Sequence, residues 1–192
     1  MTRFSYVIST CFSVLAIGGL AFVHVSPKLI WNASGSTPIG LYAVASDEDL
    51  SVGDLVVVDP PQSLASYLDG RGYLPEGVPL LKHIAALPGQ RVCRAGSTVS
   101  VDERVVAQAK PNDRFGHALP VWQGCHIVAS TELFLLNRDH PDSLDGRYFG
   151  ALPVDAVIGR AVPILTDQDS DGRYVWRADR RADAAPQSSD RK

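Results

Sequence analysis

The chain has few cysteines and no surplus of positive charge. Its 192 residues include three cysteines and carry a formal net charge of −3. The sequence has no CxxC pair and no Cys/His cluster, so we expect no zinc site. A nucleic-acid-binding surface needs clustered Lys and Arg, and we therefore expect no nucleic-acid partner.

Long helical patterns are scarce after the N-terminal segment, and only residues 62–68 are predicted to be helical. The rest reads as short apolar runs between Gly, Pro and Asp turns, which is typical of strands. The predicted strands span residues 39–45, 55–58, 80–87, 98–107, 126–129, 133–137 and 157–165. This pattern predicts a mainly β domain, folded as a compact barrel or sandwich.

The N-terminus has a long uncharged stretch, residues 4–25, between Arg3 and Lys28. At 1.5 Å per residue it would span about 33 Å, enough for the hydrocarbon core of a bilayer. A cleaved signal peptide is the alternative, but residues 21–25 are bulky for a cleavage site. We predict one transmembrane helix at 4–26, a β domain at 27–166 and a polar, disordered tail at 167–192.

Two cysteines, Cys93 and Cys125, remain once Cys11 is assigned to the apolar segment. In an oxidising compartment, closing the loop between them would stabilise the fold by about 3 to 4 kcal/mol. The spacing alone fits two unrelated buried thiols nearly as well.

The first segment that could carry chemistry is Ser34-Gly35-Ser36-Thr37-Pro38-Ile39-Gly40. Its glycines and proline favour an irregular backbone, on which Ser36 could expose both its hydroxyl and its amide. A plain polar linker is the alternative. Asn32-Ala33-Ser34 also matches a glycosylation sequon, which we interpret as coincidental.

Lys82 is the second candidate, because it lies in an apolar run from Val78 to Leu87. An ordinary lysine is neutral in only about one molecule in 2,500 at pH 7, but burial lowers its pKa by up to several units. A buried Lys82 could then act as the base for a serine nucleophile. The alternative is a strand-edge lysine whose ammonium reaches water.

A Ser-His-Asp triad is the competing arrangement. The histidines available to it are His83, His117, His126 and His140. His83 and Lys82 point to opposite faces of a regular strand, and the sequence has no G-x-S-x-G elbow. We therefore favour the Ser/Lys pair.

The third segment runs from Asn137 to Gly150. In the simplest interpretation it is a polar loop with a surface ion pair between Asp145 and Arg147, worth under about 1 kcal/mol. In the functional interpretation, the Ser143 hydroxyl orients the lysine amine.

Together these segments resemble the bacterial type I signal peptidases in type and order. The similar motifs are Ser34 to Pro38, Val52 to Val58, Lys82 to Val92 and Ser143 to Arg147. The resemblance implies a signal-peptidase-like β domain outside the cytoplasmic membrane that cuts preproteins without metal or cofactor. It also implies a role for each matching residue. Ser36 would be the nucleophile and Lys82 the general base, while Ser34 and the amide of Ser36 would form the oxyanion hole. Ser143 would support the lysine, and Asp145 with Arg147 would support the loop.

Finer features are similar to the TraF-type conjugative-transfer peptidases of that family. They are Ser36 to Tyr42, Trp122 to Cys125 and Arg147 to Gly150. This branch acts on pilin precursors, and some members join the trimmed pilin into a ring. The resemblance also makes Asp145 a candidate third catalytic residue and favours a Cys93–Cys125 disulfide. Gly146 departs from the family pattern, in which serine is usual.

We therefore predict a single-pass serine endopeptidase of the bacterial inner membrane, with its catalytic domain on the periplasmic side. Its expected partners are a pilin-like precursor and the lipid bilayer. A housekeeping signal peptidase, a self-cleaving repressor and a non-catalytic membrane-tethered β module are the alternatives. The repressor would carry a DNA-binding module where this chain has its apolar stretch.

Overall fold

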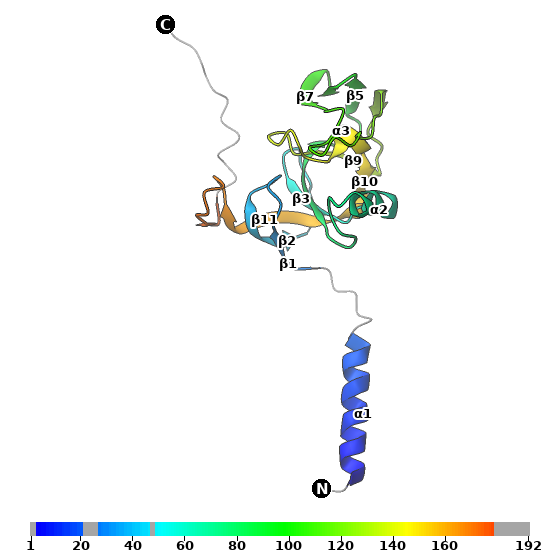
Figure 1. Cartoon of the computed structure of the whole chain (residues 1–192), viewed down its shortest axis with the longest axis vertical. Coiled ribbons are helices and arrows are strands. Elements are labelled where there is room, and N and C mark those ends of the chain that lie inside the picture. The colour runs from blue at the N-terminus through cyan, green and yellow to red at the C-terminus, as the bar shows by residue number, and fades with distance from the viewer. Residues whose placement is uncertain (1–2, 21–26, 47–48, 179–192) are drawn as a thin grey trace.

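The computed structural model describes residues 3–20, 27–46 and 49–178 and contains two β-sheets (Figure 1). The helices are α1 (Arg3–Leu20), α2 (Gln62–Gly70) and α3 (Gly146–Phe149), with a 3-10 turn η1 (Val154–Ala156). The strands are β1 (Leu29–Asn32), β2 (Ile39–Ala45), β3 (Leu55–Val58), β4 (Leu80–Ala86), β5 (Arg91–Ala95), β6 (Thr98–Val101), β7 (Arg104–Gln108), β8 (Gly124–Ile127), β9 (Glu132–Leu136), β10 (Leu152–Pro153), β11 (Val157–Asp167) and β12 (Val175–Trp176).

The larger sheet has the strand order β1-β2-β11-β3-β4-β9-β10, and β12 pairs with β11. Strands β3, β4 and β9 are rich in branched apolar residues, which suit a sheet that is covered on its faces. Val56, Val58 and Ile84 form one buried cluster with Leu133 and Leu135. Strand β4 therefore lies inside the sheet, between β3 and β9, rather than at an edge.

Strand β2 pairs antiparallel with β11, and the two backbones approach each other very closely at Gly40. A Cβ atom added to Gly40, whose φ is +148°, would lie 2.1 Å from the carbonyl oxygen of Leu165. Only glycine fits at this approach of two backbones. The close contact fixes β2, and with it the β1–β2 turn, relative to the rest of the sheet.

The smaller sheet has the order β7-β6-β5-β8 and lies at the end of the β domain away from β1 (Figure 1). Its apolar face packs against the larger sheet, where Val92 and Val99 join Phe134 and Leu136 in a second buried cluster. Cys93 and Cys125 lie directly opposite each other on β5 and β8 and form a disulfide. The predicted disulfide is thus confirmed, as is the mainly β fold class.

Several predicted elements agree with the observed ones. Strands β2 and β3 have the predicted bounds, and α2 begins where predicted. The single strand predicted at 98–107 is wrong, because Asp102 and Glu103 adopt positive φ and turn the chain into the β6–β7 hairpin. A two-residue turn of this kind usually carries Asn-Gly or Asp-Gly, so Asp-Glu gave no clear signal.

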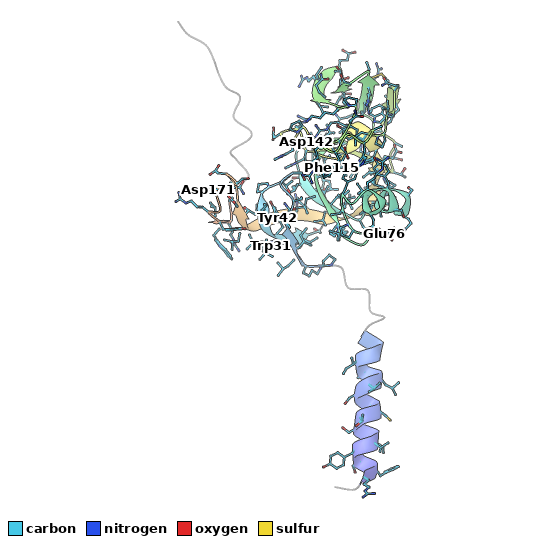
Figure 2. All side chains as sticks on the ribbon, viewed as in Figure 1. Trp31, Tyr42, Glu76, Phe115, Asp142 and Asp171 are labelled. Atoms are coloured by element: carbon cyan, nitrogen blue, oxygen red, sulfur yellow. A yellow bond between two sulfur atoms is a disulfide. The ribbon has the colours of Figure 1, made fainter. Side chains whose placement is uncertain are left out.

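The predicted transmembrane anchor is not supported. Helix α1 has 18 residues, or about 27 Å at 1.5 Å per residue, against a hydrocarbon core of about 30 Å. Across the described ranges, we find no helix with the length and apolar character that a membrane crossing requires. In Figure 2 the α1 side chains lie apart from the β domain. Residues 21–26 of the predicted span lie outside the described residues.

The ordered sheet continues past the predicted domain end at residue 166. Strand β11 runs to Asp167, and Val175 and Trp176 of β12 pair with Thr166 and Leu165. The Asp167 carboxylate accepts the amides of Asp171 and Gly172, which closes the turn between these strands. Residues 179–192 of the predicted tail lie outside the described residues.

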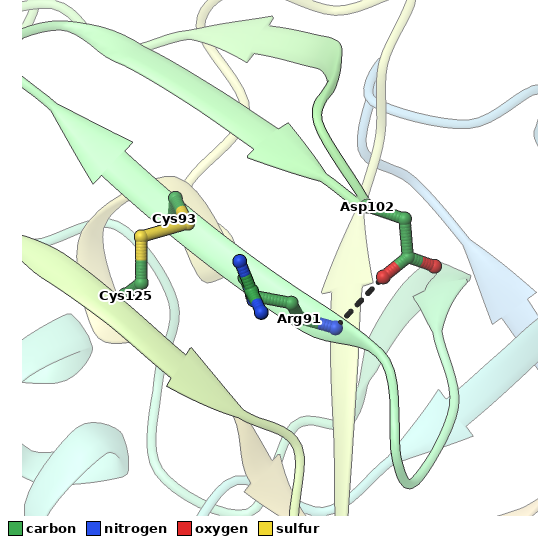
Figure 3. The surroundings of a disulfide bond; sticks show 4 residues. All are labelled: Arg91, Cys93, Asp102 and Cys125. Atoms are coloured by element: carbon green, nitrogen blue, oxygen red, sulfur yellow. Dashed lines mark hydrogen bonds between the residues drawn. A yellow bond between two sulfur atoms is a disulfide. The ribbon is translucent and has the colours of Figure 1, made fainter.

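The disulfide should contribute measurably to stability, since it closes a loop of 32 residues (Figure 3). We expect the double variant Cys93→Ser/Cys125→Ser to lose about 3 to 4 kcal/mol of unfolding free energy, measured by chemical denaturation. The matched control is Cys11→Ser, which removes an exposed free thiol and should change stability by less than about 0.5 kcal/mol. Equal stabilities of the double variant and the control would contradict this expectation.

Candidate active site

A cavity of about 690 Å³ brings together four of the predicted site residues from three distant parts of the sequence. Ser36 comes from the β1–β2 turn, Lys82 from β4 and Ser143 from the loop between β9 and α3. Ser34 also lines the cavity. Much of the remaining wall is apolar, including Leu68, Leu74, Val78, Leu80, Leu81, Leu119, Leu144 and Tyr148. Polar and charged residues also line the cavity, namely Asn32, Tyr73, Lys110, Asn112, Asp113, Arg114 and Asp142.

Lys82 is buried, with only 5% of its surface exposed. The strand-edge interpretation is thereby excluded, because β4 has a neighbour on each side. Burial lowers the pKa of Lys82 from 10.5 to about 8, against a smaller raising effect of the Asp145 charge. About one molecule in ten is then neutral at pH 7, which makes the amine a usable base.

The Lys82 amine has one hydrogen-bond partner among the described residues. Its Nζ donates to Ser143 Oγ over 2.8 Å, and Ser143 is itself buried. A neutral amine that gives one N–H to this hydroxyl has fewer directions left for its lone pair. No hydrogen bond joins Lys82 to Ser36 in the described part of the chain, although both line the cavity. Catalytic hydrogen bonds are often long before substrate binds.

Asn137 holds the backbone on both sides of Lys82. Strand β9 ends at Leu136, opposite His83, so its backbone no longer pairs with β4 beyond that point. The Asn137 side chain continues the pairing: Nδ2 donates to the Leu81 carbonyl and Oδ1 accepts the His83 amide. Sequence reasoning assigned Asn137 no role, because an asparagine at a strand end reads as an ordinary turn residue.

Asp145 and Arg147 form a buried ion pair rather than the surface pair of the simpler interpretation. Their side chains are 0% and 1% exposed, and Arg147 Nη2 lies 2.8 Å from Asp145 Oδ2. The Asp145 carboxylate also accepts hydrogen bonds from the backbone N–H groups of Asn137 and Arg147. Arg147 in turn donates to the carbonyls of Asn137 and His140. All the hydrogen bonds found for Asp145 in the described residues hold the loop, and none reaches Lys82.

The loop is tied to the smaller sheet at α3. Arg94, next to the disulfide, donates to the Arg147 carbonyl, and Trp122 Nε1 donates to the Gly146 carbonyl over 3.0 Å. A Cβ on Gly146 would lie 2.7 Å from the Phe134 ring and 2.8 Å from the Leu135 carbonyl. This crowding explains why glycine stands where the family pattern has serine.

Ser36 is half-buried in the turn that joins β1 and β2. Its amide donates no hydrogen bond within the described residues and so remains available to a ligand. Ser34, the second expected oxyanion donor, is exposed, and its hydroxyl donates to Asn32 Oδ1 over 2.8 Å. That hydroxyl must rotate before it can stabilise an oxyanion. Asn32 is 5% exposed, which excludes its use as a glycosylation acceptor.

The histidines lie outside the cavity that Lys82 and Ser36 line. None of the four candidates is among the described residues that line the cavity. His83 Nδ1 lies 3.2 Å from Asn137 Oδ1, and His117 contacts Asp113. The described residues also contain no group of three or more His, Cys, Asp or Glu that could hold a metal ion. The geometry thus gives no support to a Ser-His-Asp triad.

Removing one partner of the buried ion pair should be costly, because it leaves the other charge uncompensated. We expect Asp145→Asn to lower the unfolding free energy by about 3 to 5 kcal/mol. Asp142→Asn is the matched control, since Asp142 pairs with Lys110 at the surface and its loss should cost under about 1 kcal/mol. Chemical denaturation of both variants measures the difference, and equal losses would contradict a supporting role for the Asp145–Arg147 pair.

Comparison with known proteins places this geometry in a family. The model of the family "Signal peptidase, peptidase S26" matches residues 2–166. The chain is also similar to a solved signal peptidase I from Enterococcus faecalis, with 19% identity over 60% of this chain and 98% of that one. The TM-score of that match is 0.37.

Relatives in conjugation systems are more similar in sequence. The probable conjugal transfer protein TraF of Sinorhizobium fredii is 34% identical over 143 residues, which cover 70% of this chain and 76% of the relative. The conjugal transfer protein TraF of Agrobacterium fabrum is 34% identical and the plasmid transfer protein TraF of Escherichia coli 30%, each with 70% of this chain and 81% of the relative covered. The chain therefore belongs to the peptidase S26 family of signal peptidases, as a TraF-type member.

Proposed function

We propose that this chain is a serine endopeptidase that removes leader sequences from exported precursors, with Ser36 as nucleophile and Lys82 as general base. Within that class we propose the precursor of a conjugative pilin as its substrate. The observation that carries the proposal is the buried Lys82 amine, whose pKa is lowered to about 8, in the cavity that Ser36 also lines. A lysine with an ordinary pKa could not serve as a base near neutral pH.

In the first half of the reaction, Ser36 Oγ attacks the carbonyl carbon of the scissile peptide bond. The hydroxyl proton passes to Lys82 Nζ, and the carbonyl electrons move onto the oxygen. Collapse of this intermediate breaks the C–N bond, and the Lys82 ammonium returns the proton to the departing amine. The product is an ester between Ser36 and the new carboxyl end of the substrate.

In the second half, a nucleophile attacks the ester carbonyl and gives its proton to Lys82. Ser36 Oγ leaves and takes up that proton, which regenerates the free enzyme. If the nucleophile is water, the product is a linear chain with a free carboxylate. If it is the substrate's own amine, the product is a ring, which is lighter than the linear chain by one water molecule.

The oxyanion of each intermediate needs donors that point to where the charge develops. We assign this role to the amide of Ser36 and the hydroxyl of Ser34, both in the β1–β2 turn. Ser143 holds the amine, while the Asp145–Arg147 pair and Asn137 position the loop and the strand beneath it. Asp145 is therefore a positioning residue in this proposal, acting through the loop that carries Ser143.

The mainly apolar cavity suits an extended precursor segment with uncharged side chains near the cut. We propose that the enzyme acts at the cell envelope, with its β domain in the periplasm, since the Cys93–Cys125 disulfide is of the kind that persists in an oxidising compartment. Contact with the lipid bilayer stays a prediction, which the partition of the full chain between membrane and soluble fractions tests.

Co-expression with a candidate pilin precursor tests the chemistry. We expect the wild-type chain to shorten the precursor, as read by intact mass, and Ser36→Ala and Lys82→Ala to leave it whole. Loss of either group should lower the rate by at least about 10³-fold, because the two act as one unit. A processed precursor with either variant would overturn the assignment.

His83→Ala is the matched control for this experiment. It lies next to Lys82 on the same strand but does not line the cavity, so it should leave processing intact. Processing of an unrelated secreted preprotein as fast as of the pilin precursor would favour a housekeeping signal peptidase. A wild-type chain that processes neither and takes up no β-lactam at Ser36 would favour a non-catalytic β module.

A further inference from the structure

Asn32 is a buried amide directly before the turn that carries Ser36. It is the last residue of β1, paired with Gly40 of β2, and its surface is 5% exposed. The turn itself, residues 33–38, contains no regular helix or strand. Its conformation must therefore be fixed by contacts other than backbone pairing.

The donor half of the Asn32 amide holds the carbonyls of the turn. Nδ2 lies 2.9 Å from the Ser34 carbonyl oxygen, 3.0 Å from that of Thr37 and 3.1 Å from that of Pro38. It also lies 2.8 Å from Thr37 Oγ1, on a side chain that is itself buried. The two N–H groups are shared among these four oxygens, which lie before and after Ser36.

The acceptor half holds the start of the same turn. Asn32 Oδ1 accepts the Ser34 amide over 3.0 Å and the Ser34 hydroxyl over 2.8 Å. A carboxylate could replace this half but not the donor half, because it has no proton to give to the carbonyls. Only an amide of this length satisfies both halves from one position.

We propose that Asn32 is the positioning residue of the nucleophile, which fixes the turn so that the Ser36 hydroxyl and amide point into the cavity. This inference rests on the proposed role of Ser36. Asn32 also lines the cavity, but its side-chain hydrogen bonds all go to the turn, so in this proposal it acts through the backbone on both sides of Ser36. The hydrogen bond from the Ser34 hydroxyl to Asn32 Oδ1 also sets the resting orientation of that hydroxyl.

The test measures acylation of Ser36 in the full chain by a penem β-lactam, followed over time by intact mass. In Asn32→Asp, which keeps the acceptor half, we expect the acylation rate constant to fall by about 10- to 100-fold, as for a misplaced reacting group. The penem concentration for half-maximal rate should change by less than about threefold, and labelling should still reach completion. Reduced stability alone would lower the fraction of molecules that become labelled, but it would not lower the acylation rate constant of the folded molecules.

The pH profile separates misplacement from a charge effect of the new carboxylate. If Asn32 only positions Ser36, the rate of Asn32→Asp should rise with pH through the same midpoint as in the wild type, because Lys82 is unaltered. A midpoint moved upward, with the wild-type rate regained at high pH, would mean that the carboxylate acts on Lys82 by charge, and would overturn the proposal.

Thr37 gives a second pair of variants if Asn32→Asp does not fold. Thr37→Val removes the Oγ1 acceptor and should slow acylation about 3- to 10-fold, and Thr37→Ser, which retains the hydroxyl, should restore the rate. Wild-type rate constants in both Asn32→Asp and Thr37→Val would overturn the positioning role while Ser36 remained the nucleophile. Absence of penem labelling at Ser36 in the wild type would overturn both this inference and the proposed function.

Discussion

The burial of one lysine amine is the constraint on which the rest of this structure depends. Lys82 lies on β4, an interior strand with apolar neighbours, where the charged form of the amine is poorly solvated. Lowering its pKa from 10.5 to about 8 corresponds to a shift of about 3 kcal/mol toward the neutral form, relative to a lysine in water. The hydrogen bonds around Lys82 then limit the directions that the lone pair of its neutral amine can take.

Two groups of side-chain to backbone hydrogen bonds make the site rigid, one on each side of the cavity. On one side, Asn32 holds the turn that carries Ser36. On the other, Arg147 and Asp145 hold the loop that carries Ser143, while Asn137 joins that loop to β4. Irregular segments have no ladder of their own, so buried polar side chains must satisfy their carbonyls and amides. Such support is what a reacting pair needs in order to stay aligned.

The smaller sheet contributes to the same arrangement from a distance. Its disulfide joins β5 to β8, and Arg94 of β5 donates to the carbonyl of Arg147. Trp122, just before β8, donates to the neighbouring carbonyl of Gly146. Stability of the smaller sheet and the position of the Ser143 loop are therefore linked through two consecutive backbone carbonyls of α3.

The sequence was most informative where local pattern and motif agree. The alternating and branched residues of β2 and β3 predicted the observed bounds of these strands. The apolar run around Lys82 fitted a buried lysine but also a strand-edge one, and the structure shows it buried. The motifs named Ser36, Lys82 and Ser143, which line one cavity. Periodicity did not predict the hairpin turn at Asp102 and Glu103, because glutamate, unlike glycine, is an uncommon choice for positive φ at the second turn position.

Other features could not be predicted from the sequence because they depend on long-range contacts. Asn32 and Asn137 look like ordinary polar residues next to strands, and their importance comes from carbonyls brought to them by folding. The crowding at Gly146 arises from Phe134 and Leu135 on another strand. The depth of burial of the Asp145–Arg147 pair likewise depends on the packing of α3, which local sequence does not specify.

The most direct measurement for this account is the titration of Lys82 by NMR. The chain has four lysines, so selective ¹³C labelling gives a simple spectrum, and Lys82→Arg identifies the signal that belongs to this residue. The account predicts a midpoint near 8 for Lys82. A midpoint near the ordinary value of about 10.4 would contradict it, because the amine would then be charged and unable to activate Ser36.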